Sequence, residues 1–489
     1  MKDIANGSQS PGIYNIISIN EYTFFTANDF INGYELWRTD GTTANTNLFK
    51  DFTPSNVNQG NTRFGFLTLF KGYLYMQVNG GDIWRTDGIQ LTLFKSFTSS
   101  SYTPGSFIVI GDYLYFAASE YVNGNYLGYE LYKTDGVTTT MVKDIDSRIG
   151  AGSYPEKFCN VNGTLFFTAY EVTNGTQLWK SDGTATGTVM VKNIDINGNY
   201  TSFSEMISSN GLIYFMTNSY RKLWRSDGTA SGTFLLYDFG TNFMGGYTFY
   251  NMIDYKNKIY FRGFEYQGDG ELWESDGSVA GTKLTKNISP YYDSHPEAFK
   301  EVNGVMYFSA NRKFWKSDGT ANGTVEVSDR ISPSRFYNIN NTLYLSGGTF
   351  SDGHEFWKSD GTTTGTTIVA NMAPGNMSSY AGWLHLNNNK LYLLAELGAL
   401  GQELYVMNLQ CADQFNLMIS ENYSNGTTII NEAKRVTATN KILNGAKATY
   451  SVGEYILLSP GFEANNGSVF KTDLTGCNNN NNSVPATRN

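Results

Sequence analysis

The chain has 489 residues, of which 15% are aromatic and 16% are charged, and it carries 51 glycines and a formal net charge of −9. This composition suits short strands and tight turns, and the acidic balance argues against a nucleic-acid groove, which needs clustered Lys and Arg. No run of about 18 apolar residues occurs, so the sequence predicts no membrane span.

One sequence string recurs through most of the chain. Its first copy is ELWRTDGTTANT at Glu35, and a fuller copy is QLWKSDGTATGT at Gln177. The glycines of the eight Asp-Gly pairs lie 42 to 49 residues apart: Gly41, Gly88, Gly136, Gly183, Gly228, Gly277, Gly319 and Gly361. A regular period of 40 to 50 residues predicts a propeller or a solenoid.

Each repeat divides into four short strands. In the fourth unit the strands are expected at 158–161, 164–169, 177–181 and 188–194, with a tight Asn162-Gly163 turn between the first two. Four antiparallel strands per unit form one blade of a β-propeller.

The third strand of each unit places Leu and Trp on neighbouring residues, which point to opposite faces of a strand. Both faces must then be covered, as they are when blades stack. We interpret the aromatic position as inter-blade core rather than a ligand ladder. Its members are Trp37, Trp84, Tyr132, Trp179, Trp224, Trp273, Trp315 and Trp357.

The two ends of the repeat array predict how the ring closes. Met1 to Ile4 matches the fourth-strand ending at Val142 to Ile145, and the last unit, with strands near 383–386, 391–394 and 403–407, lacks a fourth strand. Residues 1–409 are therefore expected to form an all-β propeller of about eight to nine four-stranded blades. Propellers usually have four to eight blades, so an open or truncated array is the alternative.

The repeated string, with its V-x-D/N-I ending, resembles the ELWxxDGT repeat family of large exported bacterial proteins. It departs from the pattern at Glu274, where other clear copies have Lys or Arg, and at Ile89 and Val137, where Thr is missing. The resemblance implies an extracellular or cell-surface location and supplies no catalytic residues. The first residues, MKDIANGSQS, lack a signal-peptide pattern, so the sequence is expected to be part of a longer polypeptide.

The period stops after Met407, and residues 410–477 contain strand-length apolar runs separated by turns. The stretch YSVGEYILLSPGFEANNGSVF resembles the small stacked-β module of type IX secretion cargo. Cys411 and Cys477 bracket this module and are a disulfide candidate in an oxidising location, whereas Cys159 is expected to be a buried thiol. Residues 478–489 are expected to be an Asn-rich flexible tail.

No motif points to catalysis, a metal or a cofactor. The three histidines, His295, His354 and His385, lack paired-ligand spacing. The Asp-Gly loop lacks the glycine spacing of a phosphate loop, and one carboxylate is too few for calcium. We interpret its aspartates as turn residues: Asp40, Asp87, Asp135, Asp182, Asp227, Asp276, Asp318 and Asp360.

The turns of a four-stranded meander lie on two faces of the ring. The 1–2 and 3–4 turns are nearly uniform, whereas the 2–3 and 4–1 loops vary in length and content. Variable loops on a rigid frame often carry binding function, although drift in surface loops would look the same. The candidate ligand-binding residues on this variable face are Tyr126, Tyr154, Tyr200, Phe243, Tyr247, Tyr291, Tyr292, His295, Phe350 and Tyr380.

These observations favour a secreted or cell-surface, non-catalytic binding protein whose variable loops engage a protein or a glycan. Two alternatives remain open. One is a structural part of a larger surface assembly. The other is a carbohydrate-active enzyme with two carboxylates at the ring centre, about 5 to 10 Å apart, although no spacing singles out such a pair.

Overall fold

The computed structural model describes residues 3–5, 9–53, 62–65, 67–79, 81–97, 107–194, 202–217, 221–240, 252–264, 270–290, 292–349, 351–370, 377–396, 401–408, 416–419, 427–430, 435–438, 441–443, 447–451, 455–458, 463–464 and 469–473. The described residues contain strands and turns but no helix. Nowhere in this part of the chain is there a helix long and apolar enough to cross a membrane.

Nine antiparallel sheets follow one another along the chain, and we call them blades 1 to 9. Blades 1 to 3 are β1 (Tyr14–Ile19), β2 (Tyr22–Asn28), β3 (Tyr34–Thr39) and β4 (Asn47–Lys50); β5 (Thr68–Phe70), β6 (Tyr73–Val78), β7 (Asp82–Thr86) and β8 (Leu91–Lys95); and β9 (Phe107–Ile110), β10 (Tyr113–Val122), β11 (Asn125–Thr134) and β12 (Thr139–Lys143). Blades 4 to 6 are β13 (Glu156–Val161), β14 (Thr164–Glu171), β15 (Gly175–Ser181) and β16 (Val189–Lys192); β17 (Phe203–Ser209), β18 (Leu212–Thr217), β19 (Lys222–Ser226) and β20 (Phe234–Asp238); and β21 (Ile253–Tyr255), β22 (Lys258–Phe264), β23 (Gly270–Ser275) and β24 (Lys283–Lys286). Blades 7 to 9 are β25 (Glu297–Val302), β26 (Val305–Ala310), β27 (Lys313–Ser317) and β28 (Val325–Ser328); β29 (Ser332–Ile339), β30 (Thr342–Thr349), β31 (Gly353–Ser359) and β32 (Thr367–Ala370); and β33 (Gly382–Asn387), β34 (Lys390–Glu396) and β35 (Gln402–Asn408).

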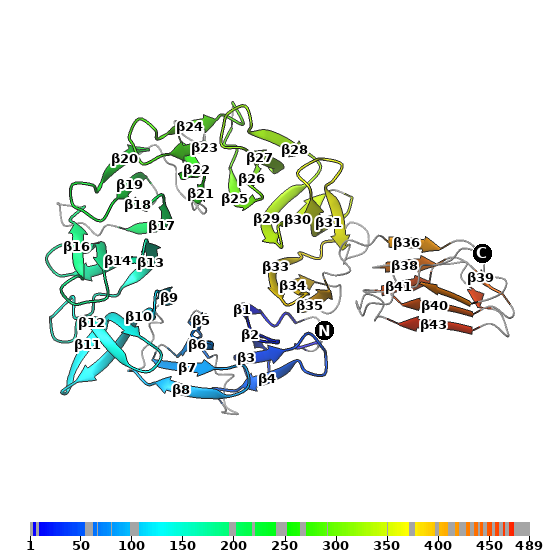
Figure 1. Ribbon diagram of the computed structural model, residues 1–489, viewed down its shortest axis with the longest axis horizontal. Helices are drawn as coiled ribbons and strands as arrows, with labels where there is room; N and C mark the ends of the chain where they lie inside the picture. Colours follow the sequence, from blue (N-terminus) through cyan, green and yellow to red (C-terminus); the bar gives the residue numbers. More distant parts are fainter. Residues whose placement is uncertain are drawn as a thin grey trace. The chain divides into compact units, whose positions relative to one another are not determined.

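The chain is a nine-bladed β-propeller, which confirms the predicted fold and the count of nine units. Blades 1 to 8 each have four strands in sequential order, and the ninth sheet has three among the described residues. The first strands of neighbouring blades contact one another, as β9 and β13 or β25 and β29 do. They therefore form the inner rim, and blades 1 to 8 succeed one another around a central opening (Figure 1).

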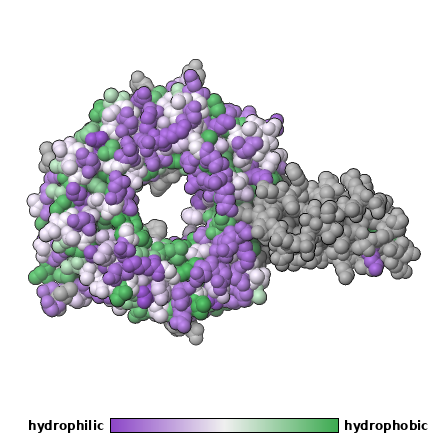
Figure 2. Space-filling model, viewed as in Figure 1, coloured by the Kyte–Doolittle hydropathy of each residue, from purple (hydrophilic) through white to green (hydrophobic). Residues whose placement is uncertain are grey.

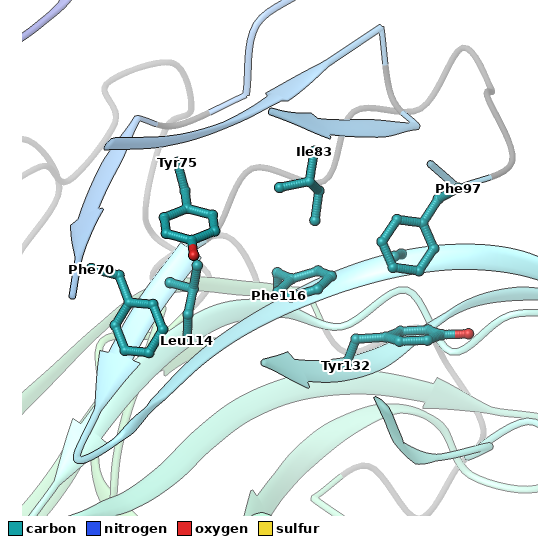
Figure 3. Packing of buried hydrophobic residues seen from close by; sticks show 8 residues of the cluster. Phe70, Tyr75, Ile83, Phe97, Leu114, Phe116 and Tyr132 are labelled. Atoms are coloured by element: carbon teal, nitrogen blue, oxygen red, sulfur yellow. The ribbon is translucent and has the colours of Figure 1, made fainter. Parts of the chain in front are cut away.

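The Leu-Trp pair of the third strand packs against both neighbouring blades. Leu178 of blade 4 lies in one cluster with Trp224 of blade 5, while Trp179 lies in a cluster with Leu131 of blade 3. Figure 3 shows the equivalent layer between blades 2 and 3, where Ile83 takes the leucine position and Tyr132 the tryptophan position. Alternate side chains on one strand thus bury apolar surface on both faces of the sheet.

The Asp-Gly segment is a turn held by its own side chains. The Asp182 carboxylate accepts hydrogen bonds from the backbone N–H and the hydroxyl of Thr184, and Gly183 has φ +87°. A Cβ on Gly187 would lie 2.1 Å from the Asp182 carboxylate, so in this copy of the turn the second glycine lets the carboxylate lie close to the backbone. These hydrogen bonds stabilise the charged form and hold the pKa of Asp182 below its ordinary value.

The same turn also fastens some blades to the one before. Arg38 of blade 1 donates to Gly88 O in the blade 2 turn, Arg85 of blade 2 donates to the carbonyl of Gly136 in the blade 3 turn at 2.9 Å, and Lys316 of blade 7 donates to Gly361 O in blade 8 at 2.9 Å. We call this contact the inter-blade latch. It gives the basic residue after the tryptophan position a structural role in these three repeats.

Residues at the N-terminus contact the last blade as the sequence predicts. The backbone N–H groups of Ile4 and Ala5 point at the Glu403 carboxylate, 3.4 and 3.5 Å from its oxygens. In blade 3 the N–H of Ile145 donates to Glu130 in the same way, so Ile4 stands where Ile145 stands. The expected fourth strand itself would include Met1 and Lys2, which lie outside the described residues.

The C-terminal region is a small parallel β-stack, as predicted. Three ladders run through it, β36 with β38 and β41, β37 with β40 and β43, and β39 with β42, and all their pairs are parallel. Their bounds are β36 (Asn416–Ile419), β37 (Thr427–Ile430), β38 (Arg435–Ala438), β39 (Lys441–Ile442), β40 (Lys447–Ser451), β41 (Tyr455–Leu458), β42 (Glu463–Ala464) and β43 (Val469–Asp473). Cys411, Cys477 and the tail 478–489 lie outside the described residues.

Candidate functional site

The strand order assigns each loop to one of two faces. The 1–2 and 3–4 turns, which include the latches, form what we call the scaffold face, and the 2–3 and 4–1 loops form the variable face. Three variable 4–1 loops contain described residues that bear on function. We name each loop by the two blades that it connects. The three loops are loop 3/4 (residues 144–155), loop 6/7 (residues 287–296, of which 291 is not described) and loop 8/9 (of which residues 377–381 are described).

A buried carboxylate holds loop 3/4 at both ends. Glu130, the first residue of its repeat string, has no exposed surface. It accepts hydrogen bonds from the N–H of Ile145 at 2.9 Å and the N–H of Ser153 at 2.8 Å, and also from the Ser153 hydroxyl. We call this arrangement the glutamate clamp.

The clamp recurs in other blades. Glu271 accepts from Ile288 N–H at 2.6 Å and from the Ser294 hydroxyl at 2.7 Å. Glu355 accepts from the Ser379 hydroxyl at 2.7 Å. In blade 4 the position is Gln177, whose side-chain oxygen accepts from Ile194 N–H at 2.8 Å. The first residue of the ELW string therefore holds a loop on the opposite, variable face of the ring.

Burial is the largest influence on the clamp carboxylates. It raises the pKa of Glu130 to about 7, against the opposing effect of its hydrogen bonds from Ser153 and Ile145. It also raises the pKa of Glu403 to about 7 and raises that of Glu35. Desolvation penalises the ionised form of a carboxyl group more than the neutral form.

The residue after the clamped serine has the same backbone conformation in all three loops. Tyr154, His295 and Tyr380 have φ of +48°, +52° and +48°, and each stands two residues before the first strand of the next blade. Gly12, with φ +57°, has the same position before β1. The left-handed conformation is costly for non-glycine residues, so the clamp enforces it at three candidate residues.

Loop 3/4 lies directly on the long β10–β11 hairpin. A Cβ on Gly128 would meet the carbonyl oxygen of Ala151 at 2.1 Å, and Gly150 N–H donates to Tyr126 O at 2.9 Å. The rings of Tyr129 and Tyr154 stack at 6.1 Å, and those of Tyr121 and Tyr126 lie 5.3 Å apart. The structure thus gathers two predicted residues, Tyr126 and Tyr154, at one loop and hairpin.

Loop 8/9 carries a similar ring pair. Tyr380 stacks on His354 with ring centroids 5.6 Å apart and planes at 28°. The His354 Nε2 lies 3.0 Å from the Ser334 hydroxyl, and burial lowers the pKa of the imidazole. His354 is therefore a neutral, partly buried ring beneath an exposed tyrosine.

Loop 6/7 is charged rather than aromatic at this position. The buried Arg262 guanidinium pairs with Asp293, and His295 Nδ1 lies 3.2 Å from a Glu297 oxygen. Tyr292, also in this loop, has 78% of its surface exposed. The described residues contain no group of three or more His, Cys, Asp or Glu side chains that could hold a metal ion.

The other predicted positions are placed as follows. Tyr200, Phe243, Tyr247, Tyr291 and Phe350 lie outside the described residues. Cys159, expected to be buried, is only partly buried, and desolvation raises the pKa of its thiol. Burial lowers the pKa of His385 on β33.

Sequence reasoning missed the partners that organise the loops. These are the clamp glutamates and the inner rings Tyr129 and His354, which immediately precede Glu130 and Glu355. A signal was present, because Ser-Tyr or Ser-His occurs just before the first strand in all three loops. Recognising it required knowing that Ser153 and Glu130 meet in space.

No family model and no curated protein matches the chain. Solved structures with some likeness include the computationally designed protein Ika8, at 11% identity over 70% of this chain and 95% of that one, with a TM-score of 0.41. Puromycin hydrolase is 9% identical over 86% of this chain and 63% of its own, with a TM-score of 0.39. BamB from Moraxella catarrhalis is 8% identical over 71% and 92%, with a TM-score of 0.38. Likenesses this distant carry no argument about function.

Proposed function

We propose that this propeller is a non-catalytic binding protein, secreted or held at a cell surface, whose variable face engages a protein or a glycan. The observation that carries the proposal is the repeated construction of loops 3/4, 6/7 and 8/9. In each, a buried clamp glutamate fixes a serine, and the next residue, Tyr154, His295 or Tyr380, is held in one left-handed conformation.

A fixed loop lowers the conformational entropy lost on binding. Tyrosines add large, rigid contact area with few rotatable bonds, and Tyr154, Tyr292 and Tyr380 are 47%, 78% and 58% exposed. Figure 2 shows one face of the ring, on which polar and apolar side chains are interspersed over the coloured residues. The extracellular location rests on the likeness to exported ELWxxDGT repeat proteins.

The test uses the full chain and two matched triple variants. The first, Tyr154→Gly, His295→Gly and Tyr380→Gly, removes the side chains but keeps the left-handed backbone, as Gly12 does before β1. The control, Ile89→Ala, Val137→Ala and Val279→Ala, removes exposed apolar groups from the scaffold face. Each protein is applied to a printed glycan array and an array of purified extracellular proteins, beside hydrolase and lyase assays on the same glycans.

We expect the parent and the control to bind the same ligand and the variable-face variant to lose at least about tenfold in affinity, which corresponds to 1.4 kcal/mol. No substrate should be cleaved. Equal loss in both variants, or cleavage that the parent catalyses, would overturn the proposal. Cleavage would favour the carbohydrate-active alternative, and absence of any ligand would favour a purely structural role.

A further inference from the structure

Two of the clamped loops present the same pair of stacked rings. Tyr154 lies over Tyr129 with centroids 6.1 Å apart and planes at 30°. Tyr380 lies over His354 at 5.6 Å and 28°. In both pairs the outer ring follows the clamped serine, and the inner ring precedes the clamp glutamate. The two pairs are therefore equivalent by position in the repeat as well as by geometry.

Both outer rings are held in place before any ligand arrives. Tyr154 N–H donates to Tyr129 O at 3.0 Å, and Tyr380 N–H donates to His354 O at 3.1 Å. The outer rings nevertheless remain 47% and 58% exposed. Each junction thus offers an exposed aromatic side chain whose backbone position is fixed.

Neither ring pair carries a net charge. Burial lowers the pKa of His354, so that its imidazole is neutral at pH 7, and tyrosines are neutral there. Within loop 3/4, Arg148 is held by Asp146 through two hydrogen bonds of 2.8 and 2.6 Å. Stacking sites for nucleic acid need a basic groove for the backbone, whereas this chain has a net charge of −9.

From this repetition we infer that the variable face binds a neutral polysaccharide, with one sugar ring stacked on Tyr154 and a second, further along the same polymer, on Tyr380. A polymer that repeats one chemical unit can occupy two equivalent subsites at once. A protein ligand rarely presents the same group twice on its surface. Sugar rings expose C–H groups with slight positive charge toward the negative face of an aromatic ring. The tyrosine hydroxyls supply hydrogen bonds that fix orientation.

Two linked subsites predict avidity. Once the first sugar is bound, the second binds intramolecularly, so the polymer should bind far more tightly than a short fragment. The inference rests on the proposed function, because it names the ligand class of the same face.

The test is affinity electrophoresis of the full chain in native gels that contain a soluble neutral polysaccharide. The probes are xyloglucan, mixed-linkage β-glucan, galactomannan and dextran, and the charged controls are polygalacturonate and heparin. The variants are Tyr154→Gly, Tyr380→Gly and their double. Val279→Ala, at a residue that is 59% exposed on the scaffold face, is the surface control.

We expect at least one neutral polymer to retard the parent and the surface control. Each single variant should lose about tenfold in affinity and the double variant about a hundredfold or more, because linkage multiplies the two subsites. A tetrasaccharide of the same polymer should bind at least about a hundredfold more weakly than the polymer. The double Tyr154→Phe, Tyr380→Phe variant keeps both rings and should remain retarded. Thermal unfolding of the glycine variants is measured beside it, because a loss of retardation without a loss of thermal stability separates stacking on the sugar from a merely structural role.

Three outcomes would overturn the inference. They are retardation only by the charged polymers, no retardation by any neutral polymer, and retardation that the double glycine variant retains. If the triple variable-face variant meanwhile loses binding to a protein on the protein array, the proposed function stands and only the polysaccharide is wrong.

Discussion

At the scale of single residues, one buried carboxyl group per repeat determines how a surface loop is held. Glu130 has no exposed surface and still accepts three hydrogen bonds from loop 3/4. A buried carboxylate is tolerated when donors surround it, and these donors are the two ends of the loop. The buried carboxylate therefore keeps its hydrogen bonds only while loop 3/4 is ordered.

The clamp carboxyls predict how stability depends on pH. Burial raises the pKa of Glu130 and of Glu403 from 4.5 to about 7, so the folded state binds more protons than the unfolded state between these values. The stability they contribute is complete below pH 4.5 and is lost as the pH rises to about 7. The turn aspartates act oppositely. The pKa of Asp182 and of Asp227 is lowered from 3.8, so their contribution is lost as the pH falls below that value.

Denaturant unfolding followed from pH 3 to pH 9 should therefore show maximal stability near pH 4 to 5, a decline toward pH 7 and a plateau above it. Glu130→Gln, which copies Gln177 of blade 4, should reduce the decline. A stability that rises between pH 5 and pH 7 would contradict this assignment.

Removing the clamp altogether should be more harmful than neutralising it. Glu130→Ala leaves the N–H groups of Ile145 and Ser153 without their acceptor, at a cost of about 1 to 3 kcal/mol for each buried unpaired group. Glu130→Gln keeps one acceptor oxygen, so a loss of about 1 kcal/mol is expected. Chemical denaturation at pH 5, below the raised pKa of Glu130, measures both, and faster proteolysis of residues 144–155 in Glu130→Ala alone would locate the effect. Equal stability of the two variants would show that the hydrogen bonds contribute little.

At the scale of elements, the inter-blade latch couples neighbouring blades. Blade 6 makes this contact with a different residue. Glu274 replaces the basic residue and pairs with Lys258 at 3.0 Å. The Tyr260 hydroxyl then donates to Gly319 O at 3.0 Å, so a neighbouring strand supplies the bond that the glutamate cannot make. In blade 7 the basic residue Lys316 makes the equivalent bond.

This difference predicts unequal effects of one substitution at two equivalent positions. Tyr260→Phe removes the hydrogen bond to Gly319 and should cost about 1 kcal/mol, as buried hydrogen bonds typically do. Tyr307→Phe, at the matching place in blade 7, should be nearly neutral because Lys316 still donates to Gly361. Phe166 in blade 4 shows that the ring alone fits there. The losses are measured as shifts in the midpoint of chemical denaturation. Equal losses in the two variants would show that the Tyr260 hydroxyl does not take over the hydrogen bond that a basic residue makes in blade 7.

Much of the architecture could be predicted from the sequence because period, turn residues and strand alternation are local signals. The unit expected at 158–194 matches β13 to β16 within two residues at most boundaries, and the Asn162-Gly163 turn has positive φ at both residues. The variable-loop tyrosines could also be named from the sequence, since exposure follows from their place in long polar loops. The arrangement of these tyrosines in space could not be predicted. The stacking of Tyr154 on Tyr129 joins loop 3/4 to blade 3, and the pairing of Ser153 with Glu130 spans 23 positions, so both depend on contacts that no periodicity encodes.

At the scale of the whole molecule, the first residues and the last blade are joined through Glu403. Glu403 is 3% exposed, and its carboxylate faces the N–H groups of Ile4 and Ala5. The same bond in blade 3 joins consecutive parts of the chain, whereas here it joins residues 399 positions apart. Closing so long a loop costs more entropy than a local contact does.

Breaking this contact should destabilise the ring without altering any single blade. Ile4→Pro removes one N–H donor, and deletion of residues 1–5 removes both. We expect losses of about 1 to 3 kcal/mol for each donor removed, since Glu403 then lies buried with fewer partners. Ile145→Pro in blade 3 is the matched control, because it breaks the same bond to Glu130 within a continuous stretch of chain.

The two proline variants differ in what they release. With Ile4→Pro, the strands of blade 9 should exchange their amide hydrogens faster than those of blades 4 and 5, because opening begins at the closure and spreads from there. With Ile145→Pro, the fastest exchange should move to loop 3/4. Hydrogen exchange followed by mass spectrometry distinguishes the two patterns. Unchanged exchange in blade 9 after deletion of residues 1–5 would mean that the N-terminal segment does not hold the ring closed.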